Sequence, residues 1–118
     1  MRVALYGIAS CDKVRAARAW LLQRGIEAEF HDFRRDGIDE TLIAGWLKRL
    51  DWADLVNRKG TTWKHLPQAR RDGIATAKAA IALMLEQPSV IRRPVMDLGG
   101  KLHVGFDADS YSNLFGKS

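Results

Sequence analysis

The sequence has few of the cysteine and histidine residues that stabilise many small proteins through disulfides or a bound zinc ion. It has one cysteine, Cys11, so no disulfide can form within the chain, and a Cys/His zinc site lacks ligands. The three histidines, at positions 31, 65 and 103, lie far apart and show no ligand spacing. A chain of this length can be stable through its apolar core alone. We therefore expect no metal and no bound cofactor.

Long apolar runs are also missing. The longest candidate, residues 79–85, is far shorter than the roughly 18 residues that a membrane span needs, so we expect no membrane association. The sequence shows no pattern of a secretory signal, and its lone cysteine is typical of a reducing compartment. These two absences together predict a cytoplasmic protein.

The chain has 118 residues, of which 47% are hydrophobic and 28% charged, as in an ordinary single globular domain. Lys and Arg outnumber Asp and Glu by 19 to 14, which gives a net charge of +5 and permits an anionic partner. The basic doublets are scattered along the chain, whereas a nucleic-acid interface favours one clustered stripe. We therefore expect a solvated basic surface and no direct DNA binding, and nothing in the sequence requires a dimer, so we expect a monomer.

The first third of the chain predicts a strand, a helix and a second strand. Residues 2–7 are short and nearly all apolar, as in a strand buried on both faces. A turn follows, and a helix opens at Cys11 with Val14, Ala17 and Leu21 on one face. Residues 27–32 alternate polar and apolar, which indicates a strand. A helix between two strands makes a right-handed crossover, so these strands should be parallel.

The rest of the chain predicts helices and then a hairpin. Asp39 can cap a helix that buries an apolar stripe between residues 42 and 50, residues 51–72 are irregular, and residues 76–86 are helical. Residues 95–98 and 101–104 flank Gly99-Gly100, a strong hairpin signal, and residues 107–115 suit a closing helix. This order predicts an α/β chain with a thioredoxin-like fold, in which a mixed four-stranded sheet (βαβ, then ββα) carries a helical insertion. We treat residues 1–118 as one domain, with the insertion at about 39–90.

Cys11 is the first candidate for chemistry. The free N–H groups at a helix start favour a negative charge, and the thiolate is the nucleophilic form of cysteine. The alternative is a small buried hydrophobe without a chemical role. Asp12 disfavours ionisation of the thiol, whereas Arg15, one turn on, favours it. Because Val14 stands three residues after Cys11, there is no Cys-x-x-Cys pair, so a thiol from outside must resolve any disulfide of Cys11.

Three blocks of the sequence carry a family resemblance. They are Tyr6-Gly7-Ile8-Ala9-Ser10-Cys11-Asp12 with Arg15-Ala16-Ala17-Arg18-Ala19-Trp20, then Leu55-Val56-Asn57-Arg58-Lys59-Gly60-Thr61-Thr62-Trp63, then residues 84–95 with Arg92-Arg93-Pro94-Val95. The chain resembles, from end to end, the arsenate reductase (ArsC) and Spx family, and most of all its small YffB-type branch. The resemblance implies a thioredoxin-like fold with an inserted helical part.

The resemblance also implies a site. Cys11 matches the nucleophile, Arg15 a basic position in the first helix turn, and Arg58 and Arg93 two of the three arginines that hold an oxyanion. Pro94 matches the cis-proline of thioredoxin-like folds. The rim of the pocket would be formed by Asn57, Thr61 and Thr62, with Trp63 either at the rim or buried as an anchor. For the three arginines, an ordinary solvated surface position is the alternative.

The sequence departs from the arsenate reductases at two points. Gly105 stands where the third arginine would fall, and Asp12-Lys13-Val14 replace the small residues after the cysteine. These departures count against arsenate. The resemblance to the YffB-type branch favours a glutathione-dependent thiol/disulfide reductase instead, with glutathione as co-substrate and glutaredoxin as a possible partner. The two alternatives are an Spx-like regulator that binds RNA polymerase and an arsenate reductase.

Overall fold

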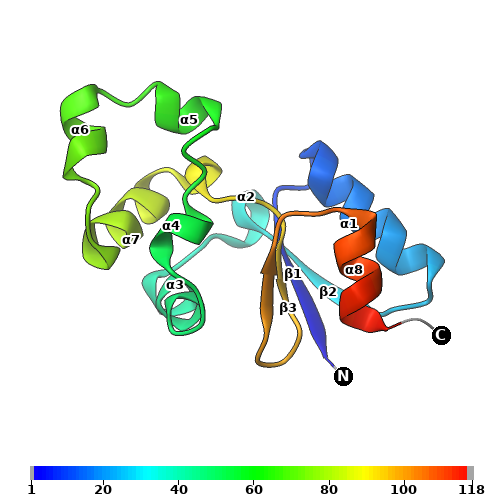
Figure 1. Ribbon diagram of the computed structural model, residues 1–118. Coiled ribbons are helices and arrows are strands. Elements are labelled where there is room, and N and C mark those ends of the chain that lie inside the picture. The colour runs from blue at the N-terminus through cyan, green and yellow to red at the C-terminus, as the bar shows by residue number, and fades with distance from the viewer. Residues whose placement is uncertain (1, 117–118) are drawn as a thin grey trace. The chain divides into compact units, whose positions relative to one another are not determined.

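The computed structural model describes residues 2–116, and it divides into two compact units. Residues 2–36 and 93–116 form the first, which we call the sheet unit, and Gly37–Arg92 form the second, the helical unit. Figure 1 shows both units, with the helical elements α3 to α7 drawn from cyan to yellow.

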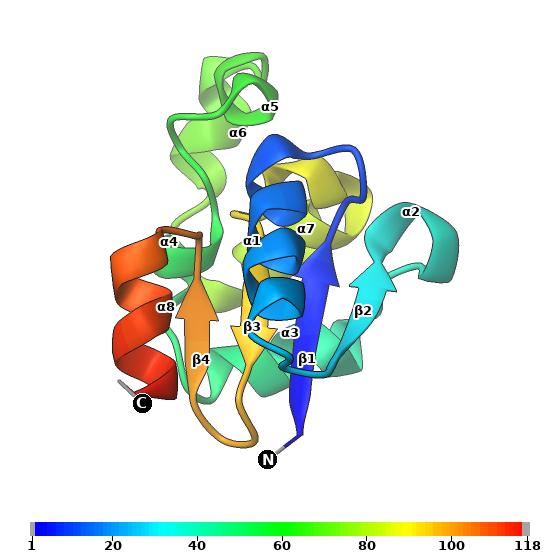
Figure 2. The same cartoon turned by 90° about the vertical axis from the view of Figure 1, so that its right-hand side faces the viewer.

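The sheet unit is built on four strands in the order β2-β1-β3-β4. Strand β1 (Val3–Gly7) pairs in parallel with β2 (Ala28–Asp32), and antiparallel with β3 (Val95–Asp97), which in turn pairs antiparallel with β4 (Leu102–Val104). Helices α1 (Asp12–Gln23) and α8 (Ala108–Phe115) cover one face of this sheet (Figure 2). A βαβ half followed by a ββα half on a mixed four-stranded sheet is the thioredoxin-like fold, so the predicted fold class is confirmed.

The core of the sheet unit lies between the sheet and these two helices. Its buried side chains come from β1, α1, β3 and α8: Val3, Leu5, Ala17, Trp20, Leu21, Met96 and Tyr111. Val3 and Leu5 alternate with half-buried residues along β1, so one face of the strand meets the helices. The spacing of Ala17 and Leu21 places both on the inner face of α1, as the helical period requires.

Gly7 lets α1 approach the end of β1. A Cβ atom on Gly7 would stand 2.6 Å from Cγ2 of Val14, and Val14 is fully buried. Gly7→Ala therefore forces the first turn of α1 away from the strand, and we expect a loss of about 1–3 kcal/mol in the free energy of unfolding. Denaturant titration of both proteins measures this loss. A matched Gly45→Ala control, at a site with open space around the added Cβ, should show no such loss.

Strand β2 forms one edge of the sheet, and a short helix, α2 (Phe33–Asp36), follows it. The Asp36 carboxylate accepts a hydrogen bond from the Asp32 N–H at 3.0 Å, and the Arg35 guanidinium donates to the Phe30 carbonyl at 3.4 Å. Arg35 and Asp36 are themselves an ion pair at 2.8 Å. The side chains of Asp36 and Arg35 thus form hydrogen bonds with one backbone N–H group and one backbone carbonyl group of the edge strand.

The helical unit contains α3 (Glu40–Leu47), α4 (Trp52–Leu55), α5 (Thr61–Lys64), α6 (Gln68–Gly73), α7 (Ala77–Glu86) and a 3-10 turn, η1 (Pro88–Val90). Helix α7 packs against α3 and α4, with Ile43, Trp46 and Leu83 almost fully buried. Asp39 caps α3 as predicted, because its carboxylate accepts a hydrogen bond from the Leu42 N–H at 2.8 Å. Val56 and Ile91 form an antiparallel backbone bridge, which joins the middle of the unit to its end.

The stretch 51–72 differs from the sequence prediction. It was expected to be irregular, but it holds α4, α5 and α6, each of four to six residues. Helices this short show less than two turns of apolar periodicity, which explains why the pattern missed them. The Asp51 side chain caps α4 by accepting from the Ala53 N–H, a local signal that was available.

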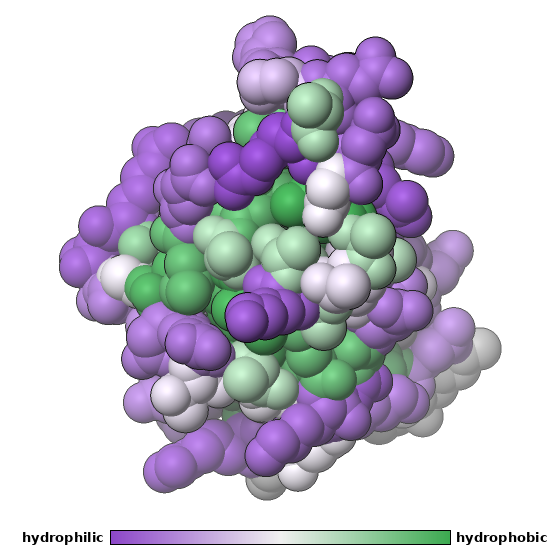
Figure 3. All heavy atoms as spheres, turned by 90° about the vertical axis from the view of Figure 1, so that its left-hand side faces the viewer, coloured by the Kyte–Doolittle hydropathy of each residue, from purple (hydrophilic) through white to green (hydrophobic). Residues whose placement is uncertain are grey.

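The helical unit also has apolar surface, which Figure 3 shows as a green area bordered by purple hydrophilic residues. A hollow of about 240 Å³ between α6 and α7 is lined by Ala69, Arg70, Gly73, Ile74, Ala79 and Ala82. At its rim, Arg70 forms an ion pair with Glu86 at 2.6 Å, which links α6 to α7.

Two further observations bear on function. Among residues 2–116, no helix has both the length and the apolar character needed to cross a membrane. Within the same residues, no three His, Cys, Asp or Glu side chains gather into a group that suits a metal ion.

Candidate active site

Cys11 lies between β1 and α1 as the residue that caps the helix. Its backbone is extended, with φ −75° and ψ 130°, and its N–H donates to the Ile8 carbonyl at 2.9 Å across a tight turn. The thiol is half-buried and is not part of a disulfide. The helix begins one residue later than predicted, at Asp12, and this leaves the Cys11 side chain beside the free N–H groups of the first turn.

The surroundings of Cys11 favour its thiolate. Burial opposes ionisation, but hydrogen bonds from the Val14 N–H, the Arg93 side chain and the Lys13 N–H outweigh it and lower the pKa of the thiol. The positive charge of Arg93 acts in the same direction. A helix start and a nearby guanidinium each favour the thiolate, which is the nucleophilic form of cysteine. The site can therefore hold a reactive thiolate.

Arg93 reaches this site from the other half of the sheet unit, where it and Pro94 lie immediately before β3. The Arg93–Pro94 peptide bond is cis, as the resemblance implied. The Pro94 carbonyl accepts a hydrogen bond from the Gly105 N–H at 2.9 Å. Gly105, the residue at the expected third-arginine position, has φ 86°, a left-handed conformation that suits glycine. At this position the chain offers a backbone contact to Pro94 in place of a guanidinium.

Arg15 lies in the first turn of α1, as predicted, and its guanidinium forms an ion pair with the Asp12 carboxylate. Both side chains are mostly exposed, at 63% for Arg15 and 90% for Asp12. An exposed pair of this kind is weak. The charge of Arg15 is therefore matched by the Asp12 carboxylate.

The other four predicted residues belong to the helical unit, where they form a group of their own. Arg58 is exposed, with its guanidinium 5.9 Å from the centre of the Trp52 ring. The Asn57 carboxamide oxygen accepts from the Lys59 N–H at 3.1 Å, and the hydroxyls of Thr62 and Ser89 are 2.8 Å apart. Thr61 is exposed at the first position of α5.

Asp32, at the end of β2, was not among the predicted site residues. Its carboxylate accepts hydrogen bonds from the Ala9 N–H at 3.3 Å and the Arg34 N–H at 2.8 Å. The Arg34 contact is the main reason that the pKa of Asp32 is lowered, against an opposing effect of burial. Ala9 lies two residues before Cys11, so Asp32 ties the cysteine turn to the sheet. The sequence did offer a signal for Asp32, because an acidic residue stands at the end of the predicted strand that pairs with β1.

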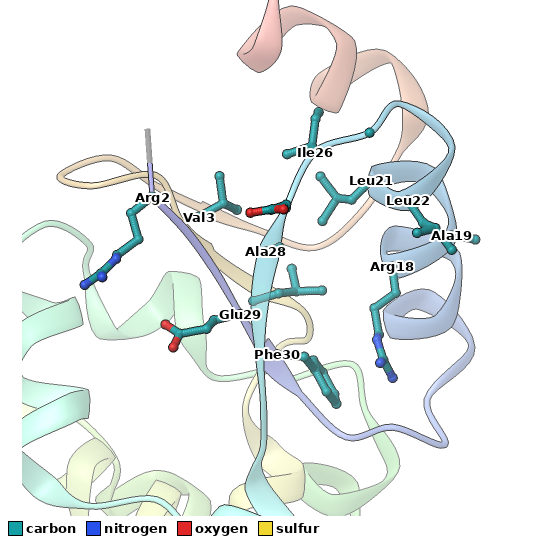
Figure 4. A pocket seen from close by; sticks show the side chains of 13 residues that line it. Arg2, Val3, Arg18, Ala19, Leu21, Leu22, Ile26, Ala28, Glu29 and Phe30 are labelled. Atoms are coloured by element: carbon teal, nitrogen blue, oxygen red, sulfur yellow. The ribbon is translucent and has the colours of Figure 1, made fainter.

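A groove of the sheet unit lies elsewhere, along α1 and β2 (Figure 4). Its volume is about 1210 Å³, and Leu21, Leu22, Ile26, Ala28 and Phe30 supply most of its apolar wall. The Arg18 guanidinium lies 4.2 Å from the centre of the Phe30 ring. None of the eight predicted site residues lines this groove, so it is separate from the chemistry at Cys11.

Substitution of Arg93 should slow the reactions of Cys11 at neutral pH. Arg93→Met removes both the hydrogen bond from the guanidinium to the Cys11 sulfur and its positive charge, so the pKa of the thiol rises. The alkylation rate of the variant should therefore increase at a higher pH than that of the wild type. At pH 7 we expect alkylation to be about threefold to tenfold slower, with Arg93→Lys in between. Rates of iodoacetamide labelling across pH measure this. Arg92→Met is the matched control, and an equal effect there would contradict the role of Arg93.

Comparisons with known proteins agree with this fold. The sequence profile of the ArsC family matches residues 6–114. An uncharacterised protein of Haemophilus influenzae is 33% identical over 113 residues, which are 96% of this chain and 98% of that protein.

Two solved structures are similar along nearly their whole lengths. The YFFB (PA3664) protein is 39% identical, with a TM-score of 0.90 over 97% of this chain and 99% of its own. An arsenate reductase (ArsC) related protein from Brucella melitensis is 42% identical, with a TM-score of 0.80 over 99% of this chain and 97% of its own. The profile match and these similarities show that the chain belongs to the ArsC family.

Proposed function

We propose that the protein is a glutathione-dependent thiol/disulfide reductase with Cys11 as its nucleophile. The observation that carries this proposal is the thiol at the start of α1, whose pKa is lowered by the Val14 and Lys13 N–H groups and by Arg93 against the effect of burial. Membership of the ArsC family, in which one relative is described as arsenate-reductase related, supports a thiol-based reduction in general.

The proposed reaction has two exchanges. In the first, the Cys11 thiolate attacks one sulfur of a disulfide, the S–S bond breaks, and the other sulfur leaves as a thiolate. In the second, a glutathione thiolate attacks the mixed disulfide and releases Cys11. The chain has no second cysteine, so the resolving thiol must be external. The second exchange leaves glutathione joined to the remaining half of the substrate. A second glutathione thiolate then attacks this mixed disulfide and releases that half as a thiolate, so the substrate gains two electrons and the two glutathione molecules become one glutathione disulfide.

The residues around Cys11 suit an anionic thiol substrate. Glutathione carries two carboxylates, and arginine side chains bind carboxylates through paired hydrogen bonds. Arg93 is the cation in contact with Cys11. The resemblance also implies substrate contacts for four residues of the helical unit, and these contacts stay predictions: Asn57, Arg58, Thr61 and Thr62. Glutathione is abundant in reducing compartments, so the proposal retains the cytoplasm as the place of action.

The direct test is to trap the mixed disulfide. Incubation with oxidised glutathione, followed by intact-mass measurement and peptide mapping, should show one glutathione attached at Cys11. Addition of reduced glutathione should then restore the free thiol. A chain that gains no glutathione over a range of oxidised-to-reduced ratios, while Cys11 remains open to iodoacetamide, would contradict the proposal.

A further inference from the structure

Gly7 is the last residue of β1, and the chain passes from there through a turn into α1 (Figure 2). A Cβ atom on Gly7 would lie 2.6 Å from Cγ2, 3.4 Å from Cγ1 and 3.6 Å from Cβ of Val14. Gly7 has no positive φ, so this position needs glycine for space and not for its backbone conformation. The side chain of Val14 thus lies in the volume that any other residue at position 7 would fill.

The backbone of the same residue, Val14, acts on the thiol. Burial raises the pKa of the Cys11 thiol, and the hydrogen bond from the Val14 N–H is the largest of the effects that lower it. Val14 is fully buried and β-branched, so few other side-chain conformations are open to it. A Cβ atom at position 7 would therefore displace the residue whose N–H stabilises the thiolate.

Cys11 connects the turn after β1 to the helix. Its N–H donates to the Ile8 carbonyl at 2.9 Å on the strand side, and its carbonyl accepts from the Arg15 N–H at 2.9 Å on the helix side. Asp32 of the neighbouring strand holds the same turn through the Ala9 N–H. Because the turn is fixed to the sheet, a displacement of α1 must change the geometry between the Cys11 sulfur and the first N–H groups of the helix.

We propose that Gly7 is a positioning residue for Cys11, because the Cβ atom that it lacks leaves room for Val14 and so keeps the Val14 N–H at the Cys11 sulfur. A hydrogen bond to a charged acceptor is strong and depends steeply on its angle, so a small displacement of the first turn weakens it. The inference goes beyond the proposed function, since it concerns the thiolate itself and holds for any reaction in which Cys11 is the nucleophile.

The test is the pH dependence of alkylation by iodoacetamide in Gly7→Ala and the wild type. The thiol loses its proton to water, the thiolate attacks the methylene carbon, a C–S bond forms and iodide leaves. The midpoint of the profile reports the thiol pKa, and the plateau reports access to the thiol. In Gly7→Ala the midpoint should move to higher pH, with the rate about threefold lower on the rising part of the profile and the plateau retained.

A second substitution, Val14→Ala, tests whether the effect runs through this contact. It keeps the N–H but removes Cγ1 and Cγ2, the two atoms nearest to the added Cβ, and leaves Cβ at 3.6 Å, an ordinary contact distance. In the Val14→Ala background, Gly7→Ala should therefore shift the midpoint far less than it does in the wild-type chain. Gly45→Ala is the matched control, because a Cβ atom there meets nothing within 4 Å and should not move the midpoint.

An unchanged midpoint in Gly7→Ala would overturn the inference, and so would an equal shift in the Val14→Ala background or in Gly45→Ala. A lower plateau without a shift of the midpoint would also overturn it, since a damaged fold or blocked access gives that result. These outcomes are distinct from failure of the proposed function. A wild-type Cys11 that forms no adduct with glutathione would remove the reductase proposal, while the comparison of midpoints would still report whether Gly7 positions the thiolate.

Discussion

Cys11→Ser is expected to abolish glutathione-dependent disulfide turnover, with a loss of at least about a thousandfold. A serine hydroxyl is not ionised at neutral pH, so the N–H groups of Lys13 and Val14 and the Arg93 side chain would have no thiolate to stabilise. Loss of the nucleophile removes the first exchange entirely, and the chain has no other thiol to replace it.

Reduction of 2-hydroxyethyl disulfide by glutathione, followed through coupled consumption of NADPH, measures this turnover. Because serine is close to cysteine in size and its hydroxyl can accept from the same N–H groups of the first helical turn, Cys11→Ser should unfold at about the same denaturant concentration as the wild type. Ser10→Ala, one residue earlier and exposed, is the matched control and should keep full activity. Turnover by Cys11→Ser above the uncatalysed rate would refute a nucleophilic role.

Tyr111 gives the largest expected effect on stability. Its side chain is fully buried in the sheet unit, and its ring packs edge-on against Phe106 at 4.7 Å and Trp20 at 5.4 Å between ring centres. Tyr111→Ala leaves a cavity of an aromatic ring, so we expect a loss of about 3–5 kcal/mol in the free energy of unfolding. Urea titration followed by tryptophan fluorescence measures it, because Trp20 reports on the same cluster.

Tyr111→Phe, in contrast, should not lower the free energy of unfolding. Among the described residues the Tyr111 hydroxyl has no hydrogen-bond partner, and burial raises the pKa of the side chain. A buried, unpaired hydroxyl is costly, so its removal should leave stability unchanged or raise it by about 1 kcal/mol. A loss of more than 1 kcal/mol in Tyr111→Phe would show that the hydroxyl is satisfied in solution.

The parts of the fold that the sequence predicted are those with a periodic or chemical signal. The alternation in 27–32, the glycine pair at 99–100 and the cap at Asp39 correspond to β2, the hairpin turn and the start of α3. Helices α4, α5 and α6 were missed because four to six residues carry too little periodicity. For the same reason the short α2 was not predicted.

The candidate site was predicted in part, for a different reason. Cys11 could be found from its position between a strand and a helix, and Arg93 with Pro94 from the resemblance. The sequence could not predict the ion pair of Arg15 with Asp12, because it depends on the direction of the side chains. The same holds for the hydrogen bond from the Ala9 N–H to the Asp32 carboxylate. Asp32 is also 23 residues from Ala9 in sequence, so its contact exists only once β1 and β2 are paired.

The pair Arg35 and Asp36 bears on whether another strand can add to the edge of the sheet at β2. An open edge strand is a template for the strands of other chains. Here the Phe30 carbonyl and the Asp32 N–H already have side-chain partners. The Arg35 guanidinium and the Asp32 N–H lower the pKa of Asp36 to about 2, so its carboxylate stays charged far below physiological pH. An incoming strand must first displace this pair, and mild acid does not remove the obstacle to fibril growth.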